Sequence, residues 1–496
     1  MGTFINRRDF VKLMGMGTAS LIVQGCADRP LSVSVGQQAA VLEPKKRPNF
    51  VFILIDDLGW ADVGCYGSSF YETPNIDKLA KEGMRFTNGY AAAPVCSPTR
   101  ASIMTGKYPA RLKITNFFYG DRRGKLNPPQ YARQLPLEEL TIAEALKEAG
   151  YVTCLVGKWH LGGKSFWPQD QGFDINIGGT NSGAPKNYFW PEWQGNPPIE
   201  GTTGEYLTDR LTDEALKFLE ANKDRAFLLY LSHHAVHLPL QAKKDLVEKY
   251  RAKAANLPRT KTPPFVPEGG NQAKQVQDHP VFAAMVESMD ESVGRVTRKL
   301  EELGIADNTV VIFTSDNGGT STAEGHPTSN VPLRAGKGWL YEGGIRVPMI
   351  IKWPGVVRPG GICDQPATST DFYPTMLEMT GIPPKPRQHI DGVSLVPLLE
   401  GKKSGGRKAI YWHYPHYSNQ GGGPCGAVRA GDYKLIEFYE DNHLELYNLK
   451  KDVSEKTNLA DRMHHKAVEL HEMLREWRKE TDAQMPTPNP DYKPEE

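Results

Sequence analysis

Residues 92–111 read AAPVCSPTRASIMTGKYPAR, and the rest of the chain is organised around this stretch. The ring of Pro98 excludes helical geometry in the residue before it, so no helix can run in from the N-terminal side. Residues 101–105 have short side chains that suit a new helix, and Gly106 can end it. We therefore expect Cys96 just before a helix N-terminus, where free N–H groups and the helix dipole favour a negative charge.

Cys96 allows two interpretations. It could be a buried structural cysteine, but the neighbouring proline, Arg100 and the helix start favour a reactive one. A thiolate phosphatase is disfavoured, because only three residues separate Cys96 from Arg100 and one of them is a proline. That spacing leaves no glycine-rich loop to ring a phosphate with backbone N–H groups.

The composition indicates a soluble globular protein. Of the 496 residues, 39% are hydrophobic and 24% charged, and this length predicts about two to four domains. The formal net charge of +1 carries no nucleic-acid signature, so we expect no nucleic-acid partner. No stretch of about 20 apolar residues is long enough to span a membrane.

The N-terminus has the pattern of a targeting segment. Residues 6–12, NRRDFVK, resemble a twin-arginine export motif, and an apolar stretch follows at 13–23. Residues 23–26 resemble a lipoprotein cleavage site with Cys26 as the lipidated residue; the alternative is a plain signal peptide cut nearby. Either way we expect the twin-arginine machinery to deliver the protein to the periplasm or cell envelope, with membrane contact only through the lipid anchor at Cys26. We assign residues 1–26 to the signal and 27–48 to a tether.

Four β-rich runs share one pattern, because each ends abruptly in a polar cluster. The runs are residues 50–55, 151–156, 226–231 and 309–313. Helical patterns lie between them, which predicts an α/β domain with a mostly parallel sheet flanked by helices. Ligands bind beyond the carboxyl ends of such strands. The four polar clusters should therefore meet at one edge of the sheet.

The pattern changes near residue 401. Short strand candidates and one amphipathic helix at 467–480 predict a small C-terminal domain, an antiparallel sheet with one helix, over residues 401–483. The large domain then covers residues 49–400, and the proline-rich residues 484–496 are expected to be a disordered tail. The spacings of the cysteines after residue 26 indicate neither a zinc site nor a set of disulfides.

Oxygen donors dominate two of the polar clusters. Asp56 and Asp57 follow the first run, and Asp316 and Asn317 follow the fourth. Carboxylates this close repel one another unless a cation compensates them. Oxygen ligands without a cluster of histidine or cysteine favour calcium or magnesium over zinc.

The stretch around Cys96 resembles the signature of the formylglycine-dependent sulfatases: Cys or Ser, any residue, Pro, usually Ser, then Arg. Thr99 replaces the commoner serine. Further resemblance lies in GKWHLG at 157–162, VHLP at 236–239, LRAGKG at 333–338 and EGGIRVP at 342–348. It implies an alkaline-phosphatase-like fold and a formylglycine that a formylglycine-generating or sulfatase-maturating enzyme makes from Cys96. It also implies one calcium ion, held by Asp56, Asp57, Cys96 once modified, Asp316 and Asn317.

The chemistry of a sulfate ester suggests a role for each remaining residue. Calcium and Arg100 would favour the ionised hydroxyl of the aldehyde hydrate, and Lys158 and Lys337 would hold the sulfate oxygens. His237 is the expected acid for the leaving alcohol and His160 the expected base. We expect hydrolysis of sulfate esters, with sulfated polysaccharide fragments as substrates.

Two alternatives stay open from the sequence. One is a phosphatase or phosphodiesterase of the same superfold, which would use two zinc ions. The other is a non-catalytic glycan-binding lipoprotein, which would explain the export signal and the aromatic stretches 187–193 and 411–417. The single oxygen-rich cluster disfavours the phosphatase. The glycan-binding lipoprotein does not explain why Cys96 and Arg100 should meet the lysines and histidines at one sheet edge.

Overall fold

The computed structural model describes residues 47–258, 261–402 and 407–493, all within one compact unit. The predicted signal, and the tether up to residue 46, lie outside the described residues. No helix in the described ranges is long and apolar enough to cross a membrane.

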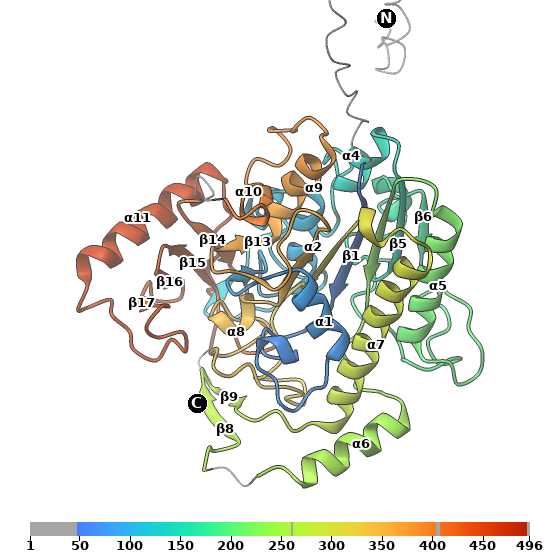
Figure 1. Cartoon of the computed structure of the whole chain (residues 1–496). Coiled ribbons are helices and arrows are strands. Elements are labelled where there is room, and N and C mark those ends of the chain that lie inside the picture. The colour runs from blue at the N-terminus through green and yellow to red at the C-terminus, as the bar shows by residue number, and fades with distance from the viewer. Residues whose placement is uncertain (1–46, 259–260, 403–406, 494–496) are drawn as a thin grey trace, which may run out of the picture. The chain divides into compact units, whose positions relative to one another are not determined.

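A sheet of eight strands forms the centre of this unit, in the order β12-β2-β11-β10-β1-β7-β5-β6 (Figure 1). Only β11 runs against the others, so the mostly parallel sheet predicted from the sequence is confirmed. The strands are β1 (Asn49–Ile55), β2 (Met84–Phe86), β5 (Val152–Gly157), β6 (Ile175–Ile177), β7 (Phe227–Ser232), β10 (Thr309–Ser315), β11 (Met349–Lys352) and β12 (Gly361–Cys363).

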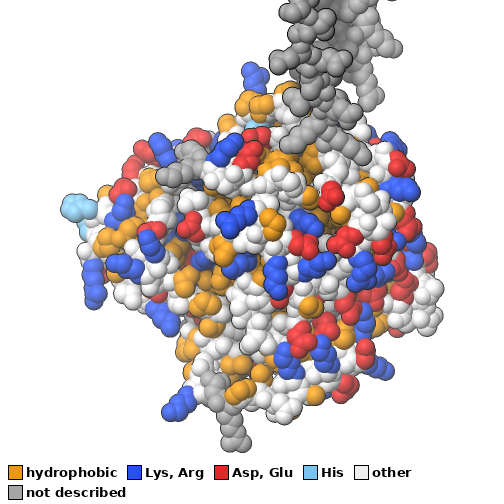
Figure 2. All heavy atoms as spheres, in the orientation of Figure 1, with side chains coloured by type: hydrophobic (Ala, Val, Ile, Leu, Met, Phe, Trp, Pro, Cys, Tyr) orange, Lys and Arg blue, Asp and Glu red, His pale blue; other side chains and the backbone are white. Residues whose placement is uncertain are grey.

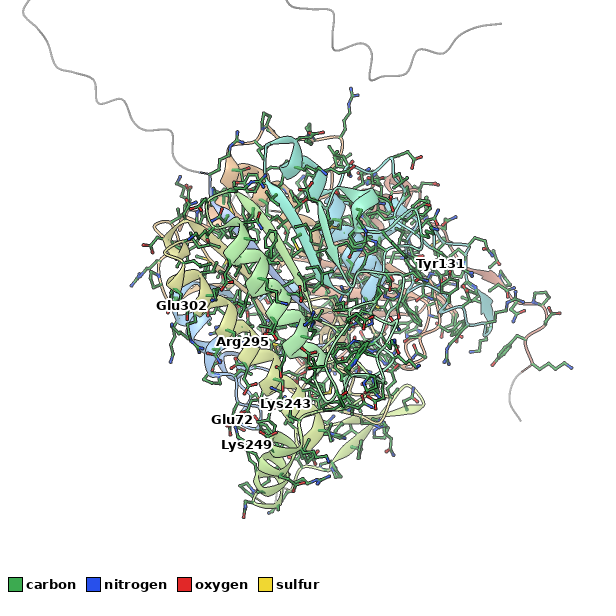
Figure 3. The ribbon with its side chains drawn as sticks, turned by 90° about the vertical axis from the view of Figure 1, so that its right-hand side faces the viewer. Glu72, Tyr131, Lys243, Lys249, Arg295 and Glu302 are labelled. Carbon is green, nitrogen blue, oxygen red and sulfur yellow. The ribbon has the colours of Figure 1, made fainter. Side chains whose placement is uncertain are left out.

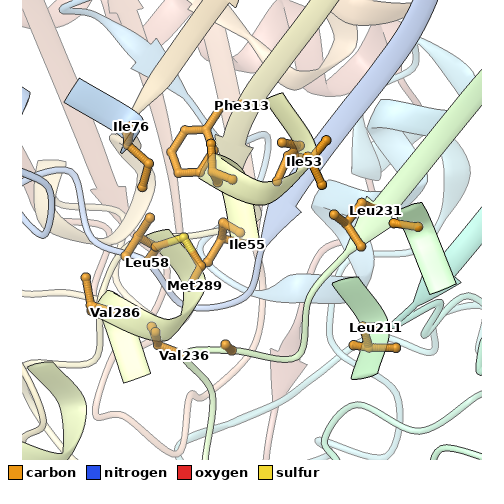
Figure 4. Close-up of a cluster of buried hydrophobic side chains, with 14 of the residues drawn as sticks. Ile53, Ile55, Leu58, Ile76, Leu211, Leu231, Val236, Val286, Met289 and Phe313 are labelled. Carbon is orange, nitrogen blue, oxygen red and sulfur yellow. The ribbon is translucent and has the colours of Figure 1, made fainter. Parts of the chain in front are cut away.

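Both faces of the sheet are covered, which explains the unbroken apolar runs. Successive side chains of a strand point to opposite faces. Thus Ile53 of β1 belongs to one hydrophobic cluster (Figure 4), whereas Phe52 and Leu54 belong to another. Each buried aliphatic or aromatic side chain contributes about 1.5–3 kcal/mol to stability.

Helices from distant parts of the chain cover the two faces. The first cluster is completed by α1 (Pro74–Glu82), α5 (Leu207–Asn222), α6 (Lys244–Ala255) and α7 (Pro280–Glu302). The second is completed by α2 (Cys96–Thr105), α4 (Ile142–Glu148), α9 (Phe372–Thr380) and α10 (Val396–Leu399). Thr141 and Glu144 form a capping box at the start of α4, which fixes that helix end.

Helix α2 begins one step earlier than predicted. Cys96 is its first residue, not the residue before it. Pro98 lies in the first turn, where its missing N–H costs no intrahelical hydrogen bond. Gly106 ends the helix in the left-handed conformation, as expected.

The C-terminal part forms an antiparallel sheet with one helix packed on it (Figure 1), as predicted. The strands are β14 (Ile410–Tyr414), β15 (Cys425–Ala430), β16 (Tyr433–Phe438) and β17 (Leu444–Asn448), and the helix is α11 (His464–Glu480). Leu470, Leu474 and Trp477 bury one face of α11.

The prediction of a disordered tail is wrong for residues 484–493. β18 (Thr487–Pro488) pairs with β4 (Leu126–Asn127), and the backbone N–H of Asn489 donates to the carbonyl of Lys125 at 2.9 Å. A distant strand thus supplies the hydrogen bonds that this proline-rich segment cannot make with itself.

Short elements complete the described residues. They are η2 (Gly64–Tyr66), β3 (Gly89–Tyr90), α3 (Pro109–Leu112), η3 (Pro168–Gln171), β8 (Phe265–Glu268), β9 (Asn271–Lys274), η4 (Ala306–Asn308), α8 (Glu342–Ile345), β13 (Ala367–Thr368) and η5 (Ser369–Asp371).

Candidate active site

Four neighbouring parallel strands end at one edge of the sheet, and each delivers a predicted site residue there. Asp56 and Asp57 follow β1, and Asp316 follows β10. Lys158 follows β5 and His237 lies in the loop after β7. Backbone hydrogen bonds hold these strand ends together, from Asp56 N to Ala235 O at 3.0 Å and from Asp316 N to Ile55 O at 3.1 Å. The predicted convergence at one edge is therefore observed.

Two buried lysines compensate the carboxylates. Lys158 Nζ lies 2.5 Å from Asp56 Oδ2, and Lys337 Nζ lies 2.7 Å from Asp57 Oδ2. A buried carboxylate without such a partner would carry a large desolvation cost. The arrangement is thus close to charge balance before any metal ion is considered.

Two oxygen atoms of the cluster have no hydrogen bond within the described residues, although Arg100 Nη2 lies 4.0 Å from one of them, Asp56 Oδ1. Asp56 Oδ1 and Asn317 Oδ1 are buried and unbonded among the described residues. The amide nitrogen of Asn317 does have a partner, because its Nδ2 donates a hydrogen bond to Asp57 Oδ1 at 2.8 Å. Asp56, Cys96 and Asp316 also offer ligand atoms within 4.8 Å of one another. Unbonded acceptors among carboxylates are the donor set that a hard cation such as Ca²⁺ prefers.

The two neighbouring aspartates have opposite pKa shifts. Burial raises the pKa of Asp56 well above its usual value, and the charges of Asp316 and Asp57 add to this. Burial raises the pKa of Asp57 too, but the positive charges of Lys337, His237 and Lys158 together outweigh burial and hold this pKa well below its usual value. A cation beside Asp56 would favour its ionised form.

Cys96 lies in the first turn of α2, buried against His160. Its Sγ is 3.3 Å from His160 Nδ1. Burial raises the pKa of the thiol, although Lys158 opposes the shift. The surroundings therefore keep the unmodified Cys96 protonated, which argues against a thiolate as the nucleophile.

Arg100 points beneath the site. Its Nε donates to Asp316 Oδ2 at 2.8 Å, and its Nη1 donates to Ser232 Oγ at 2.7 Å and to the carbonyl of Lys158 at 3.1 Å. The guanidinium thus ties the ends of β10, β7 and β5 together. Arg100 therefore holds the acidic cluster in place, and none of these hydrogen bonds goes to Cys96.

His160 is enclosed by two segments that the sequence did not mark. The ring of Phe118 lies edge-on to the imidazole, with centroids 5.5 Å apart. Gly183 packs so closely that a Cβ atom there would lie 2.6 Å from His160 Cε1. Burial lowers the pKa of His160 well below its usual value, and Lys158 and Arg100 add to this. His160 is therefore neutral near pH 7 and can accept a proton.

His237 is the most exposed histidine of the site, with 17% of its side chain accessible. Its Nδ1 donates to the carbonyl of Leu238 at 2.9 Å, which leaves Nε2 facing Asp57 Oδ2 at 3.6 Å. Burial and the charge of Lys337 lower its pKa to about 4, although Asp57 opposes the shift. A negative group that binds beside Lys337 would raise this pKa again.

Other polar groups of the site were not assigned from the sequence. Both ring nitrogens of His234 are buried and unbonded among the described residues, and the positive charges of Lys158 and Arg100 join burial in lowering its pKa. Glu324, whose charge acts on Lys337, accepts a hydrogen bond from Asn419 Nδ2 at 2.7 Å. The run Ser232-His233-His234 at the end of β7 is a local signal that could have marked His234, but no local signal could bring Asn419 to Glu324.

Comparisons with known proteins agree with this geometry. A model of the sulfatase family matches residues 48–382. The chain belongs to the sulfatase family. A second model, of the C-terminal part of N-sulphoglucosamine sulphohydrolase, matches residues 335–480.

Similar proteins extend over most of the chain. A sulfatase from Formosa agariphila is 33% identical over 518 aligned residues, covering 88% of this chain and 89% of the relative. The N-acetylgalactosamine-6-sulfatase of Canis lupus familiaris is 35% identical, covering 78% of this chain and 71% of the relative. The crystal structure of Ps i-CgsB in complex with k-i-k-neocarrahexaose has a TM-score of 0.72 at 31% identity, covering 90% of this chain and 95% of that one.

The sulfatase has the alkaline-phosphatase-like fold that the sequence resemblance implied, and it is an enzyme that hydrolyses sulfate esters. Cys96, Arg100, Lys158, His160, His237 and Lys337 all lie at the same sheet edge as the acidic cluster. The described cysteines Cys65, Cys96, Cys154, Cys363 and Cys425 are all free.

Proposed function

We propose that this sulfatase removes sulfate from sulfated polysaccharide fragments, using a formylglycine made from Cys96 and one calcium ion. The observation that carries the proposal is the pair of unbonded oxygens, Asp56 Oδ1 and Asn317 Oδ1, beside the first turn of α2. These free acceptors support a cation site next to the residue that would be modified.

Asp56, Asp57, Asp316 and Asn317 would hold the calcium, and the modified side chain at position 96 would add an oxygen. Bound calcium supplies a positive charge that polarises a sulfate oxygen and lowers the pKa of a hydroxyl beside it. It would also take over the compensation of Asp56 and Asp57, which frees the ammonium groups of Lys158 and Lys337. Both lysines are then available to bind the anionic sulfate.

The aldehyde hydrate at position 96 supplies the nucleophilic hydroxyl and a second hydroxyl for release of the product. His160 contacts position 96 and is neutral, so it accepts a proton there. His237 holds the proton for the leaving sugar oxygen, because the bound sulfate raises the pKa of its imidazole. Arg100 keeps Asp316 and the ends of β5 and β7 in place during turnover.

Sulfated sugars are the proposed substrates. Two similar proteins support this class, because one is an N-acetylgalactosamine-6-sulfatase and the other is a crystal structure in complex with a neocarrahexaose. A galactose-type sugar is the first one to test.

Maturation and export complete the proposal. A twin-arginine substrate is exported folded, so Cys96 would be oxidised in the cytosol, before α2 buries it. A formylglycine-generating or sulfatase-maturating enzyme would therefore act on the extended segment around Pro98 and Arg100. The product would then work in the periplasm or cell envelope, tethered through Cys26 if that residue is lipidated.

The test combines chemistry and metal analysis on protein matured in its native host. Peptide mass spectrometry should find the aldehyde at position 96 already in the cytosolic precursor. Metal analysis should find one calcium per chain, and sulfated galactose should release inorganic sulfate. Two zinc ions per chain together with phosphate-ester turnover would instead support the phosphatase alternative.

A further inference from the structure

Three loops meet at His160. The loop 116–124 brings Phe118 against the imidazole, and the loop 181–187 brings Gly183 against it. The loop 161–166 follows His160 directly in the chain. These loops therefore border the site on the side of His160.

Each loop carries exposed cations a few residues beyond its contact with His160. They are Arg122, Arg123, Lys164 and Lys186, and we call them the cationic rim. Each of them lies three to five positions along the chain from Phe118, His160 or Gly183, which is at most about 18 Å of extended chain. Their flexible side chains reach further.

The cationic rim is unpaired. Within the described residues, none of its four side chains has an ion pair or side-chain hydrogen bond with the protein. The three loops contain one carboxylate, Asp121, and Arg133 pairs with it. The rim thus keeps four positive charges that nothing in the described structure neutralises.

Many cations elsewhere on the surface are paired with a carboxylate. On the α6–α7 face shown in Figure 3, Lys249 lies 2.7 Å from Glu72, Lys243 lies 2.9 Å from Glu291, and Arg295 pairs with Asp213. Figure 2 likewise shows lysines and arginines interspersed with acidic side chains. The whole chain has a net charge of only +1, so four exposed cations with one carboxylate in three neighbouring loops are a local excess of positive charge.

We propose that the cationic rim binds further sulfate groups on the same substrate chain, beside the ester that is cleaved. This inference rests on the proposed function and narrows it to multiply sulfated oligosaccharides. A neutral sugar would gain nothing from four unpaired charges, whereas a polyanion is attracted over about a Debye length, roughly 8 Å at physiological salt. Charges lining one side of a site also raise the rate of substrate encounter.

The experiment compares two substrates on the matured, full-length enzyme: 4-nitrophenyl sulfate and a galactan hexasaccharide with a sulfate on every repeat. The rim variant is Arg122→Ser, Arg123→Ser, Lys164→Ser and Lys186→Ser combined. The matched control is Lys223→Ser with Arg225→Ser. These two exposed cations precede β7 and so lie at the opposite edge of the sheet from the site.

We expect the rim variant to lower kcat/KM on the hexasaccharide about 10- to 100-fold more than on 4-nitrophenyl sulfate, chiefly through KM. Raising the salt from about 0.05 to 0.5 M should reduce the kcat/KM of the wild type on the hexasaccharide. The difference in kcat/KM between the wild type and the rim variant should then become smaller. The control variant should match the wild type on both substrates.

Two results would overturn the inference while leaving the sulfatase activity intact. One is an equal loss on both substrates, which would indicate damage to the site itself. The other is unchanged hexasaccharide kinetics with lost binding to vesicles of anionic phospholipid, which would make the rim a membrane contact. Failure of the wild type to hydrolyse either sulfate ester would instead contradict the proposed function.

Discussion

Lys337 Nζ lies 2.7 Å from Asp57 Oδ2, at the position where a cation would also be attracted. Lys158 stands in the same relation to Asp56, at 2.5 Å. Without a metal ion, the two lysines therefore balance the negative charges of the two carboxylates. This predicts a protein that stays folded without its metal but cannot bind sulfate well, since both lysines are engaged.

Removal of calcium tests this relationship. Chelation should abolish turnover while the protein keeps its secondary structure, and Tm should fall by only a few degrees, because the lysines replace part of the lost charge.

Asp316→Ala should lose activity and lower Tm further, because it also removes the partner of Arg100. Calorimetry and calcium titration measure both effects. Wild-type calcium affinity and turnover in the variant would refute the ligand assignment.

Replacement of Cys96 tests the nucleophile. Cys96→Ala suits the start of a helix sterically, so the variant should fold and still bind a sulfated sugar. Turnover should fall by a factor on the order of 10⁴ or more, as when the nucleophile of a covalent mechanism is removed. Substrate binding measured by calorimetry serves as the folding control. Near-normal turnover on an aryl sulfate or a sugar sulfate would exclude position 96 as the nucleophile.

His237→Ala should affect turnover differently from Cys96→Ala. It keeps position 96 but loses the proton for the leaving group, so kcat should fall roughly 10²- to 10⁴-fold on a sugar sulfate. The loss should be smaller on an aryl sulfate, whose leaving group needs little protonation. Steady-state kinetics on both substrates decide the matter. Equal losses on the two substrates would show that His237 is not the acid.

Gly183→Ala tests the packing around His160. The added methyl group would lie 2.6 Å from His160 Cε1, so the imidazole must move away from position 96. We expect kcat to fall about 10- to 100-fold with unchanged calcium affinity, since a displacement of about 1 Å can cost that much. Gly163→Ala is the matched control, because a Cβ there meets no atom within 4 Å. Similar effects of both substitutions would contradict the packing argument.

The stability of the C-terminal sheet should depend on pH through His413. Its imidazole is buried between Tyr439 Oη at 2.8 Å and the carbonyl of Gln484 at 2.9 Å, and burial lowers its pKa to about 4. Between pH 6.5 and 4 the unfolded chain binds a proton here that the folded chain does not. As the pH is lowered through that window, the free energy of unfolding therefore decreases, by about 1.4 kcal/mol per pH unit for this group.

Urea unfolding at pH 8, 6 and 4.5 measures the effect. His413→Gln should be less stable than the wild type at pH 8, and the difference should shrink at pH 4.5, where the wild type has lost this contribution. His465→Gln, at an exposed position of α11, should leave the slope unchanged. A constant difference between His413→Gln and the wild type at all three pH values would rule out the buried neutral imidazole.

Much of the fold could be predicted because its signals are local. The apolar run at 50–55 needed cover on both faces and became β1. The helical pattern expected between the runs at 226–231 and 309–313 includes α7, Pro280–Glu302. Polar clusters at the ends of parallel strands must share an edge, so Asp56, Asp57, Asp316 and Asn317 could be brought together before any coordinates. The start of α2 was misplaced by one residue, because a proline in the first turn of a helix costs little.

What the tertiary structure decided depends on contacts between segments far apart in the chain. Residues 484–493 read as disordered because prolines pair poorly among themselves, yet β4 offers them a partner more than 350 residues away. Likewise nothing near Gly183 or Phe118 marks them as neighbours of His160. By itself the sequence determined the chemistry of the site, since residue types and strand ends are local properties. The enclosure of His160 and the rim of unpaired cations were decided by loop packing, which depends on the whole folded chain.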